Sequence, residues 1–375
     1  MERDEFSAWL RLLETPGLGR ESARALLAHF GSPEATLGAS VADRKSVVAA
    51  APAAALGRVP PDFDKRLAAT LQWLECDDLA DDAPRETRDV VALGDARFPQ
   101  ALLESPDPPL LLYVRGRVEL LQRPQIAIVG SRNPTPQGLE NARAFAAHLS
   151  RAGWVIVSGL ALGIDAAAHE GALEGEAGTI AVVGTGLDIV YPSRHRALAG
   201  RIAARGLVVS EFAIGTPSLP EHFPIRNRII AGLARGTLVV EAAVRSGSLI
   251  TARLAAEAGR DVFAIPGSIH SPQSRGCHAL IKQGAKLVES AADIVDELGP
   301  LQPSGPAAVA EFAPTVGLGE DPLLATLGFE PMSLDELIAR TGQSAAALSA
   351  RLLDLELEGR VSRLPGQTFQ RFDRA

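Results

Sequence analysis

The chain has few cysteines, few lysines and no long apolar run. Its 375 residues contain only two cysteines, too few for a disulfide framework or a cysteine-based zinc site. No stretch approaches the roughly 18 consecutive apolar residues of a membrane-spanning helix. The charged N-terminal sequence also lacks the apolar region of a signal peptide. We therefore expect a cytoplasmic protein without a membrane span.

Sequence signatures of nucleotide enzymes and hydrolases are absent as well. No Gly-x₄-Gly-Lys-Ser/Thr loop occurs among the four lysines of the chain. The segment that begins at Gly184 and Gly186 starts like a dinucleotide fingerprint, but Ile189 occupies the position of the third glycine. No serine lies in a nucleophile elbow, and no His, Asp or Glu residues have metal-ligand spacing. We expect no catalytic residue, cofactor or metal, and a protein that binds a ligand without transforming it.

The net charge of −8 does not exclude a nucleic-acid partner, because the charge is unevenly distributed. Residues 125–298 contain 16 basic and 15 acidic side chains, so the acidic excess lies in the flanks. A nearly neutral domain can still present a basic crevice if its acidic side chains lie on the outer helix faces.

The middle of the chain alternates buried strands with helices. Residues 1–75 read as helical, and residues 76–124 read as a connection and the start of the sheet domain, with short strands at 90–93 and 110–114. From residue 125 to 298, near-continuous apolar runs predict strands at 125–129, 154–158, 179–184, 207–210, 237–241, 261–265 and 285–288. Helices are predicted between them at 136–151, 163–174, 194–204, 226–234, 247–258 and 276–283. This pattern indicates an α/β fold with a doubly wound parallel sheet.

The C-terminal pattern is that of a winged helix. Residues 299–322 are rich in proline and glycine and read as a linker. Residues 323–375 read as three helices and two short strands, with a capping box from Ser333 to Glu336. The expected recognition helix, 344–358, has Arg351 as its only basic residue, so we favour a protein-contact or regulatory role over DNA reading.

Two strand-to-helix turns point to an anion. The runs that end at Ser131-Arg132 and at Ser158-Gly159 place backbone N–H groups at the ligand-binding edge of a doubly wound sheet. Loops at the same edge contain Gly163, Arg194, Arg226, Asn227, Arg228, Arg245 and Ser246. Guanidinium groups suit phosphate oxygens, so a phosphate backbone is the expected ligand. The alternative is that these arginines form structural ion pairs with Glu211 and Glu241.

Two other motifs have both a functional and a structural interpretation. The turn that contains Gly17 and Gly19 has the form of a helix-hairpin-helix, which can hold a DNA phosphate or serve only as a structural hairpin. Asp165 and His169 lie one helical turn apart; we favour a helix-capping carboxylate near an ordinary buried histidine over a catalytic pair.

Ordered motifs also carry a family resemblance. They are Val129-Gly-Ser-Arg-Asn-Pro-Thr135, Ser158-Gly-Leu-Ala-Leu-Gly-Ile-Asp165, Gly184-Thr-Gly-Leu-Asp-Ile-Val-Tyr-Pro192, Phe223-Pro-Ile-Arg-Asn-Arg-Ile-Ile-Ala-Gly232, Val240-Glu-Ala with Ser246-Gly-Ser-Leu-Ile-Thr-Ala252, Val262-Phe-Ala-Ile-Pro-Gly267 and Leu280-Ile-Lys-Gln-Gly-Ala285. Through them, the chain resembles the DNA-processing protein A (DprA/Smf) family over nearly its whole length.

The resemblance implies a homodimer whose extended Rossmann-like domain binds single-stranded DNA without reading sequence. It implies a non-enzymatic role in protecting incoming DNA and loading the RecA recombinase during natural transformation, with a SAM-like or helix-hairpin-helix N-terminal domain and a C-terminal winged helix. The DNA-binding residues that it assigns are Ser131, Arg132, Ser158, Gly159, Arg226, Asn227, Arg228 and Lys282. Further candidate contacts are Gly163, Arg194, Arg245 and Ser246, with Gly17 and Gly19 in the N-terminal hairpin. One departure is His278, where relatives often have asparagine.

An enzymatic alternative comes from the same fold class. Phosphoribohydrolases of the LOG type join a glycine-rich loop to a helix with a catalytic glutamate. Residues 246–252 with Glu257 are distantly similar to that arrangement, but the Pro-Gly-Gly loop is missing.

Overall fold

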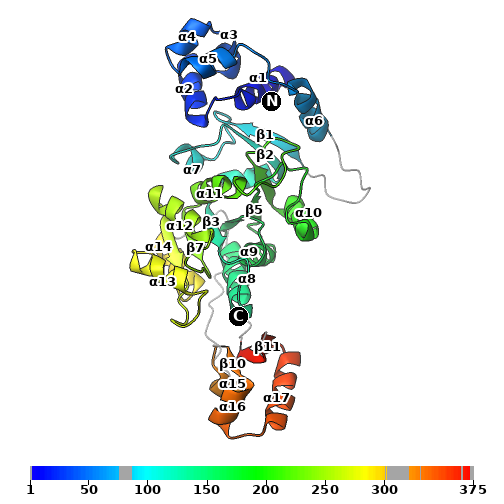
Figure 1. Ribbon diagram of the computed structural model, residues 1–375, viewed down its shortest axis with the longest axis vertical. Coiled ribbons are helices and arrows are strands. Elements are labelled where there is room, and N and C mark those ends of the chain that lie inside the picture. The colour runs from blue at the N-terminus through cyan, green and yellow to red at the C-terminus, as the bar shows by residue number, and fades with distance from the viewer. Residues whose placement is uncertain are drawn as a thin grey trace.

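The computed structural model describes residues 2–75, 87–299, 301, 321–329, 331–364 and 366–371. In sequence order they form a group of short helices, a nine-stranded α/β sheet and a small helical unit with a three-stranded sheet (Figure 1). Most of the predicted linker at 299–322 lies outside the described residues. No described helix combines the length and the apolar character needed to cross a bilayer.

The N-terminal helices pack on one end of the sheet. They are α1 (Arg3–Glu14), α2 (Arg20–Phe30), α3 (Pro33–Gly38), α4 (Val41–Lys45), α5 (Ala50–Ala55) and α6 (Phe63–Glu75). Their buried side chains, among them Trp9, Leu12 and Leu26, share one apolar core with Leu111 and Tyr113 of the sheet.

The sheet has the strand order β1-β2-β6-β5-β4-β3-β7-β8-β9. Its parallel part consists of β3 (Gln125–Val129), β4 (Val155–Ser158), β5 (Thr179–Val182), β6 (Leu207–Ser210), β7 (Gly236–Val239), β8 (Asp261–Ala264) and β9 (Lys286–Leu287). β1 (Arg88–Ala92) and β2 (Leu111–Gly116) extend it beyond β6 with antiparallel pairing. The predicted doubly wound parallel sheet is thus confirmed, with two antiparallel strands added at one edge.

Helices cover both faces of the sheet, which explains why its central strands are apolar throughout. The helices around the sheet are α7 (Gln100–Leu103), α8 (Pro136–Arg151), α9 (Ile164–Ala172), α10 (Arg196–Arg205), α11 (His222–Leu233), α12 (Ser248–Glu257), α13 (Arg275–Lys282) and α14 (Ala291–Leu298), with 3₁₀ turns η1 (Val118–Gln122) and η2 (Ser193–His195). Side chains of α8, α9 and α14 share a core with Ile126 and Ile156. On the other face, side chains of α11, α12 and α13 pack on Ala127 and Val157.

Two helices, α11 and α14, differ clearly from the sequence prediction. α11 begins at His222 rather than at residue 226, because Pro224 lies in its first turn, where a proline costs no hydrogen bond. α14 was not predicted, although Ser290 and Asp293 form a capping box at its start.

The C-terminal unit is a winged helix. It contains α15 (Pro322–Leu327), β10 (Met332–Ser333), α16 (Leu334–Thr341), α17 (Ala345–Leu357), β11 (Val361–Leu364) and β12 (Thr368–Arg371), with strand order β10-β12-β11. The predicted capping box from Ser333 to Glu336 is present. Leu337, Leu348 and Leu352 form the centre of its core.

Candidate functional site

A cleft lies where the sheet reverses its strand order. β3 pairs with β4 on one side and with β7 on the other, so the loops after β3 and β7 diverge at this switch point. The cleft has a volume of about 660 Å³. It is lined by Val129–Asn133, Ala161, Asp165, Tyr191, Pro220, Phe223, Pro224, Arg226, Asn227, Ile230, Ala243, Arg245–Ser248, Ile250, Thr251 and Gln273. The structure thus brings together several predicted residues far apart in sequence.

The loop after β3 is shaped by close packing. A Cβ on Gly130 would lie 2.7 Å from the Ile164 side chain and 2.9 Å from the Glu241 carbonyl oxygen, so the position has no room for a side chain. The Ser131 hydroxyl is buried and accepts a hydrogen bond from the Asn133 N–H at 3.1 Å. Arg132, next in the chain, is exposed to the cleft.

The half-buried Glu241 carboxylate holds the far end of this loop. Thr135 caps α8 by accepting a hydrogen bond from the Gly138 N–H at 3.0 Å. Its own N–H and hydroxyl donate to the Glu241 carboxylate, at 2.9 and 2.5 Å. Burial of Glu241 raises the pKa of its carboxyl group. Glu241 therefore anchors the loop after β3 to the end of β7. Within the described residues it binds Thr135 and forms no ion pair with an arginine, which was the structural alternative.

Arg226 is a buried strut beneath the cleft. Its guanidinium donates to the carbonyl oxygen of Gly159 at 2.6 Å and to that of Val182, so it joins the ends of β4 and β5. The buried Asp165 carboxylate provides its counter-charge, and burial lowers the pKa of Arg226 to about 10. A Cβ on Gly159 would overlap the Arg226 guanidinium. The described contacts thus commit the Nη1 atom of this guanidinium to protein carbonyl groups.

Ser158 is also internal to the fold. Its hydroxyl is fully buried and donates to the carbonyl oxygen of Ile128 at 2.7 Å. Together with Gly159 and Arg226, it sets the shape of the cleft floor.

Aromatic rings and an arginine form a stacked surface on one wall, which we call the aromatic wall. The Arg132 guanidinium carbon lies 5.7 Å from the centroid of the Phe223 ring. The Tyr191 ring lies 5.7 Å from the same ring, tilted by 39°. Tyr191 is 51% exposed, so this surface is open to a ligand.

The start of α12 and the loop before it also line the cleft. Arg245 is exposed there, and the Ser246 hydroxyl bonds to that of Ser248 at 2.7 Å. The Asn227 amide donates to the Gly247 carbonyl oxygen at 3.4 Å. Among the described residues, neither Arg132 nor Arg245 has an ion-pair partner, so two cations and a helix N-terminus face the cleft.

Other predicted residues lie outside this cleft. Arg194 is exposed in η2, and Lys282 is exposed in the last turn of α13. Gly163, at φ +80°, packs against the loop after β3. Gly17 and Gly19 lie in the turn between α1 and α2.

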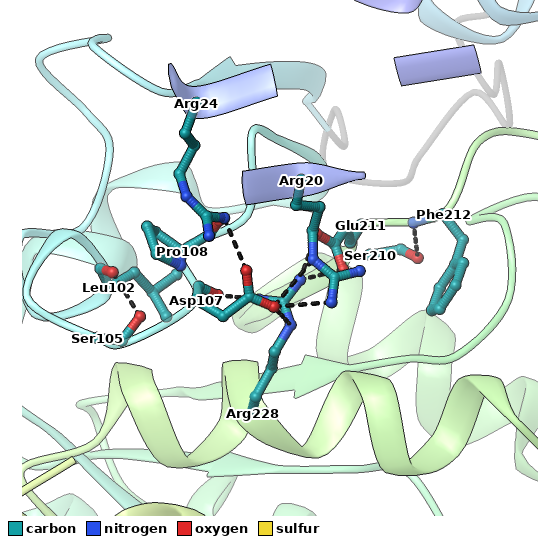
Figure 2. A network of polar contacts seen from close by, with 10 residues as sticks. All are labelled: Arg20, Arg24, Leu102, Ser105, Asp107, Pro108, Ser210, Glu211, Phe212 and Arg228. Atoms are coloured by element: carbon teal, nitrogen blue, oxygen red, sulfur yellow. Dashed lines mark hydrogen bonds and ion pairs between the residues drawn. The ribbon is translucent and has the colours of Figure 1, made fainter. Parts of the chain in front are cut away.

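Arg228 belongs to an ion-pair network between the N-terminal helices and the sheet, which we call the Asp107 network (Figure 2). The Asp107 carboxylate accepts hydrogen bonds from Arg20 at 2.7 and 2.9 Å and from Arg24 at 2.7 Å. The Nε atom of Arg228 lies 3.1 Å from the same carboxylate. Arg228 also pairs with Glu211, as the structural alternative predicted.

His169 and Cys277 are buried in the interior of the fold. His169 is fully buried; its Nδ1 bonds to the Thr179 hydroxyl at 2.8 Å rather than to Asp165. Burial lowers the pKa of His169 to about 3 and raises that of the Cys277 thiol to about 12. No group of three His, Cys, Asp or Glu side chains within the described ranges is arranged to hold a metal ion.

Comparison with known proteins identifies the family. The family model for DNA recombination-mediator protein A matches residues 89–299, and that for the DprA winged helix domain matches residues 307–367. Protein Smf of Escherichia coli K12 is 40% identical over 312 residues, covering 80% of each chain. DNA processing protein DprA of Streptococcus pneumoniae is 52% identical over 200 residues, which are 53% of this chain and 71% of that protein.

Solved structures agree with this assignment. The crystal structure of DprA from Streptococcus pneumoniae matches with a TM-score of 0.64 and 37% identity, covering 79% of this chain and 98% of that one. A structure of DprA from Helicobacter pylori, described for its single-stranded DNA binding mode, matches with a TM-score of 0.52 and 31% identity, covering 56% and 95%. The chain therefore belongs to the DNA recombination-mediator protein A family, the DprA/Smf family of DNA-processing proteins.

Proposed function

We propose that this protein binds single-stranded DNA in the cleft at the switch point, without reading its sequence. The observation that carries the proposal is the pairing of two exposed arginines, Arg132 and Arg245, with the aromatic wall in one cleft. Single-strand binders combine cations that follow the phosphate backbone with aromatic rings that stack on bases. The single-stranded DNA binding mode described for the Helicobacter pylori relative supports the same assignment.

The predicted residues divide into two roles under this proposal. Ser131, Arg132, Asn227, Arg245 and Ser246 line the cleft, where we place the direct contacts to DNA. Ser158, Gly159, Gly163 and Arg226 shape the cleft through internal packing and hydrogen bonds.

The remaining predicted residues would act at a distance from the cleft. Lys282 and Arg194 would be further phosphate contacts along a longer strand, and Gly17 and Gly19 would contribute through the N-terminal hairpin. Arg228 would act through the Asp107 network.

The cellular role that we propose is the one the family resemblance implies. A cytoplasmic homodimer would cover incoming single strands and load the RecA recombinase on them during natural transformation, with no catalytic step. A cleft whose arginines contact backbone rather than base edges suits a strand of any sequence.

The enzymatic alternative has less support from the structure. Glu257, its candidate catalytic residue, ends α12 and pairs with Arg253 on an exposed surface. It lies roughly 13 Å along the helix from Ser248, which lines the cleft, at a rise of about 1.5 Å per residue. The glutamate and the cleft are at opposite ends of the same helix.

The test is fluorescence anisotropy of a labelled oligo-dT strand over a salt series. We expect Arg132→Ala to weaken binding about tenfold and to lower the slope of log affinity against log salt by about 0.7, the contribution of one phosphate contact on a single strand. Arg253→Ala, which removes an exposed arginine from the outer part of α12, is the matched control and should bind like wild type. If Arg132→Ala bound oligo-dT with wild-type affinity, the DNA-binding site would not be this cleft. Release of free base from AMP by wild type would favour the enzymatic alternative.

A further inference from the structure

The helix α17 has two apolar stripes, and only one of them is used by the fold. Leu348, Leu352 and Leu355 are buried in the winged-helix core. A second stripe, Ala346, Ala350, Leu353 and Leu357, is exposed. Leu353 is 56% exposed, and Leu357, at 81%, is the most exposed large apolar side chain in the described part of the chain. We call this second stripe the α17 seam.

The α17 seam has the spacing of a helix-packing surface. Its residues follow one another at intervals of four, three and four positions, which places them on one side of the helix. This is the spacing of the a and d positions of a coiled coil, where small and large apolar residues receive the side chains of a second helix. The buried stripe lies at c and f positions of the same heptads, on the far side of the helix. The domain core holds α17 in place while the seam faces outward.

The charges beside the seam select its occupant. Asp354 and Glu356 take the flanking e and g positions next to Leu353 and Leu357. Arg351 does not cancel the acidic charge of these flanks, because one guanidinium is shared among several carboxylates: it is hydrogen-bonded to Asp321 through Nε at 2.8 Å and Nη2 at 2.5 Å, and its Nη1 atom lies 3.7 Å from the Asp354 carboxylate. Among the described residues, Glu356 has no ion-pair partner. Two copies of α17 packed on their seams would bring like charges together in either orientation. The acidic flanks would also repel DNA phosphates.

We infer that the α17 seam is the docking site for an amphipathic helix of another protein, with an apolar stripe of heptad spacing and lysine or arginine on its flanks. Such a helix would bury Leu353 and Leu357 and pair its cations with Asp354 and Glu356. This site lies on the winged helix, not at the cleft, and its occupation does not depend on DNA being bound there.

Two designed peptides test the inference on the full-length protein. Both have about three heptads with leucine at every a and d position; one carries lysine at the e and g positions, and the other carries glutamate. We expect saturable binding of the lysine peptide in fluorescence anisotropy and at least about tenfold weaker binding of the glutamate peptide. Equal binding of the two peptides, or binding of neither, would overturn the proposal.

Two surface variants make the result specific to the seam. Leu353→Ser with Leu357→Ser should weaken the lysine peptide at least about tenfold, because burial of two leucines is lost. Asp354→Lys with Glu356→Lys should reverse the preference toward the glutamate peptide. Circular dichroism checks that both variants keep the wild-type helix content, and Leu357→Ser alone replaces the leucine pair if that variant unfolds.

Oligo-dT binding and the molecular mass in solution test whether DNA or a second copy of the chain occupies the seam instead. Both variants should bind oligo-dT like wild type, so failure of the peptide test and failure of the DNA assignment are separable. Loss of oligo-dT binding in the leucine variant would make the seam a DNA contact instead. A lower molecular mass of that variant than of wild type in sedimentation equilibrium would make a second copy of the chain the occupant. Either result would overturn the proposal.

Discussion

The guanidinium of Arg132 lies over the ring of Phe223, with 5.7 Å between its Cζ atom and the ring centroid. Arg132 comes from the loop after β3 and Phe223 from the first turn of α11, so the contact joins two elements that are distant in sequence. A cation on an aromatic face engages the flat side of the guanidinium and leaves its N–H edge available to an oxygen ligand. Under the proposed function, the pair would offer a stacking surface to a base and an N–H donor to a phosphate side by side.

Substitutions of Phe223 and of Arg132 are expected to affect DNA binding in different ways. Phe223→Leu should weaken oligo-dT binding by roughly 5- to 150-fold, since stacking of one base on an aromatic ring is worth about 1–3 kcal/mol. The slope of log affinity against log salt should stay at the wild-type value, because no charge is removed. Anisotropy over a salt series measures both quantities.

Phe329→Leu is the control for the Phe223 variant, because Phe329 is half exposed in the winged helix. It should bind oligo-dT like wild type. An unchanged affinity in Phe223→Leu would show that bases do not stack on the aromatic wall. A reduced salt slope would show that Arg132 had been displaced.

The position of Arg132 could be predicted from the sequence, while the burial of Arg226 could not. An apolar strand that ends at Gly130-Ser131 sets the cleft edge by local pattern alone. In α11, successive residues are about 100° apart around the axis, so Arg226 and Arg228 point in different directions. Which of them faces the sheet depends on how α11 packs. In the structure, Arg226 is buried and donates to the Gly159 carbonyl oxygen, whereas Arg228 points toward the Asp107 carboxylate.

The hydrogen bonds between Thr135 and Glu241, which anchor the loop after β3, could not be predicted from local sequence patterns either. Thr135 and Glu241 are 106 positions apart, and only the pairing of β3 with β7 brings them together. The same holds for the antiparallel strands β1 and β2, whose short apolar runs predicted strands but not their partners or direction.

Gly159 is expected to tolerate no side chain, because a Cβ there would overlap the Arg226 guanidinium and lie 2.6 Å from an Asp165 carboxylate oxygen. Gly159→Ala should lower the free energy of unfolding by about 1–3 kcal/mol, the usual cost of overpacking a filled interior. Urea denaturation measures this change.

Gly247→Ala is the matched control for Gly159→Ala. Gly247 has a helical φ of −62° and no atom within 4 Å of an added Cβ. Its substitution should change the free energy of unfolding by no more than about 0.5 kcal/mol. Equal effects of the two substitutions would contradict the packing argument for Gly159.

The buried His169 is expected to make folding sensitive to acid. Its pKa in the folded protein is lowered to about 3, while the unfolded chain takes up this proton near pH 6.5. The unfolded state therefore binds more protons between these values, and stability falls as pH drops. From pH 7 to pH 5, His169 should remove about 2 kcal/mol from the free energy of unfolding.

Urea denaturation of wild type and His169→Gln at pH 7 and pH 5 isolates this contribution. The difference between the two proteins should shift by about 2 kcal/mol in favour of the variant at pH 5. Asp165 and Glu241, whose pKa values are raised by burial, act in the opposite direction but are present in both proteins. His29→Gln, which replaces an exposed histidine, should follow the wild-type curve. A constant difference between wild type and His169→Gln would show that folding does not lower the pKa of His169.

The Asp107 carboxylate is expected to hold the N-terminal helices on the sheet, because three arginine side chains converge on it (Figure 2). Asp107→Asn keeps the shape but removes the charge. Glu211, which pairs with Arg20 and Arg228, would then be the remaining carboxylate beside the three arginines. We expect a loss of about 1.5–3 kcal/mol in the free energy of unfolding, the range for hydrogen bonds to charged groups. Limited proteolysis should also cut within residues 2–75 sooner than in wild type.

The pH dependence of the Asp107 contribution has a definite sign. The arginines lower the pKa of Asp107, so its stabilisation is present above the carboxyl pKa of the unfolded chain and is lost as pH falls through the lower folded value. The stability gap between wild type and Asp107→Asn should therefore close in acid. Glu104→Gln, which breaks a more exposed pair with Arg260 at 3.5 Å, is the control and should cost no more than about 0.5 kcal/mol. A gap that stays constant down to low pH would mean that the arginines are held by packing rather than by the Asp107 charge.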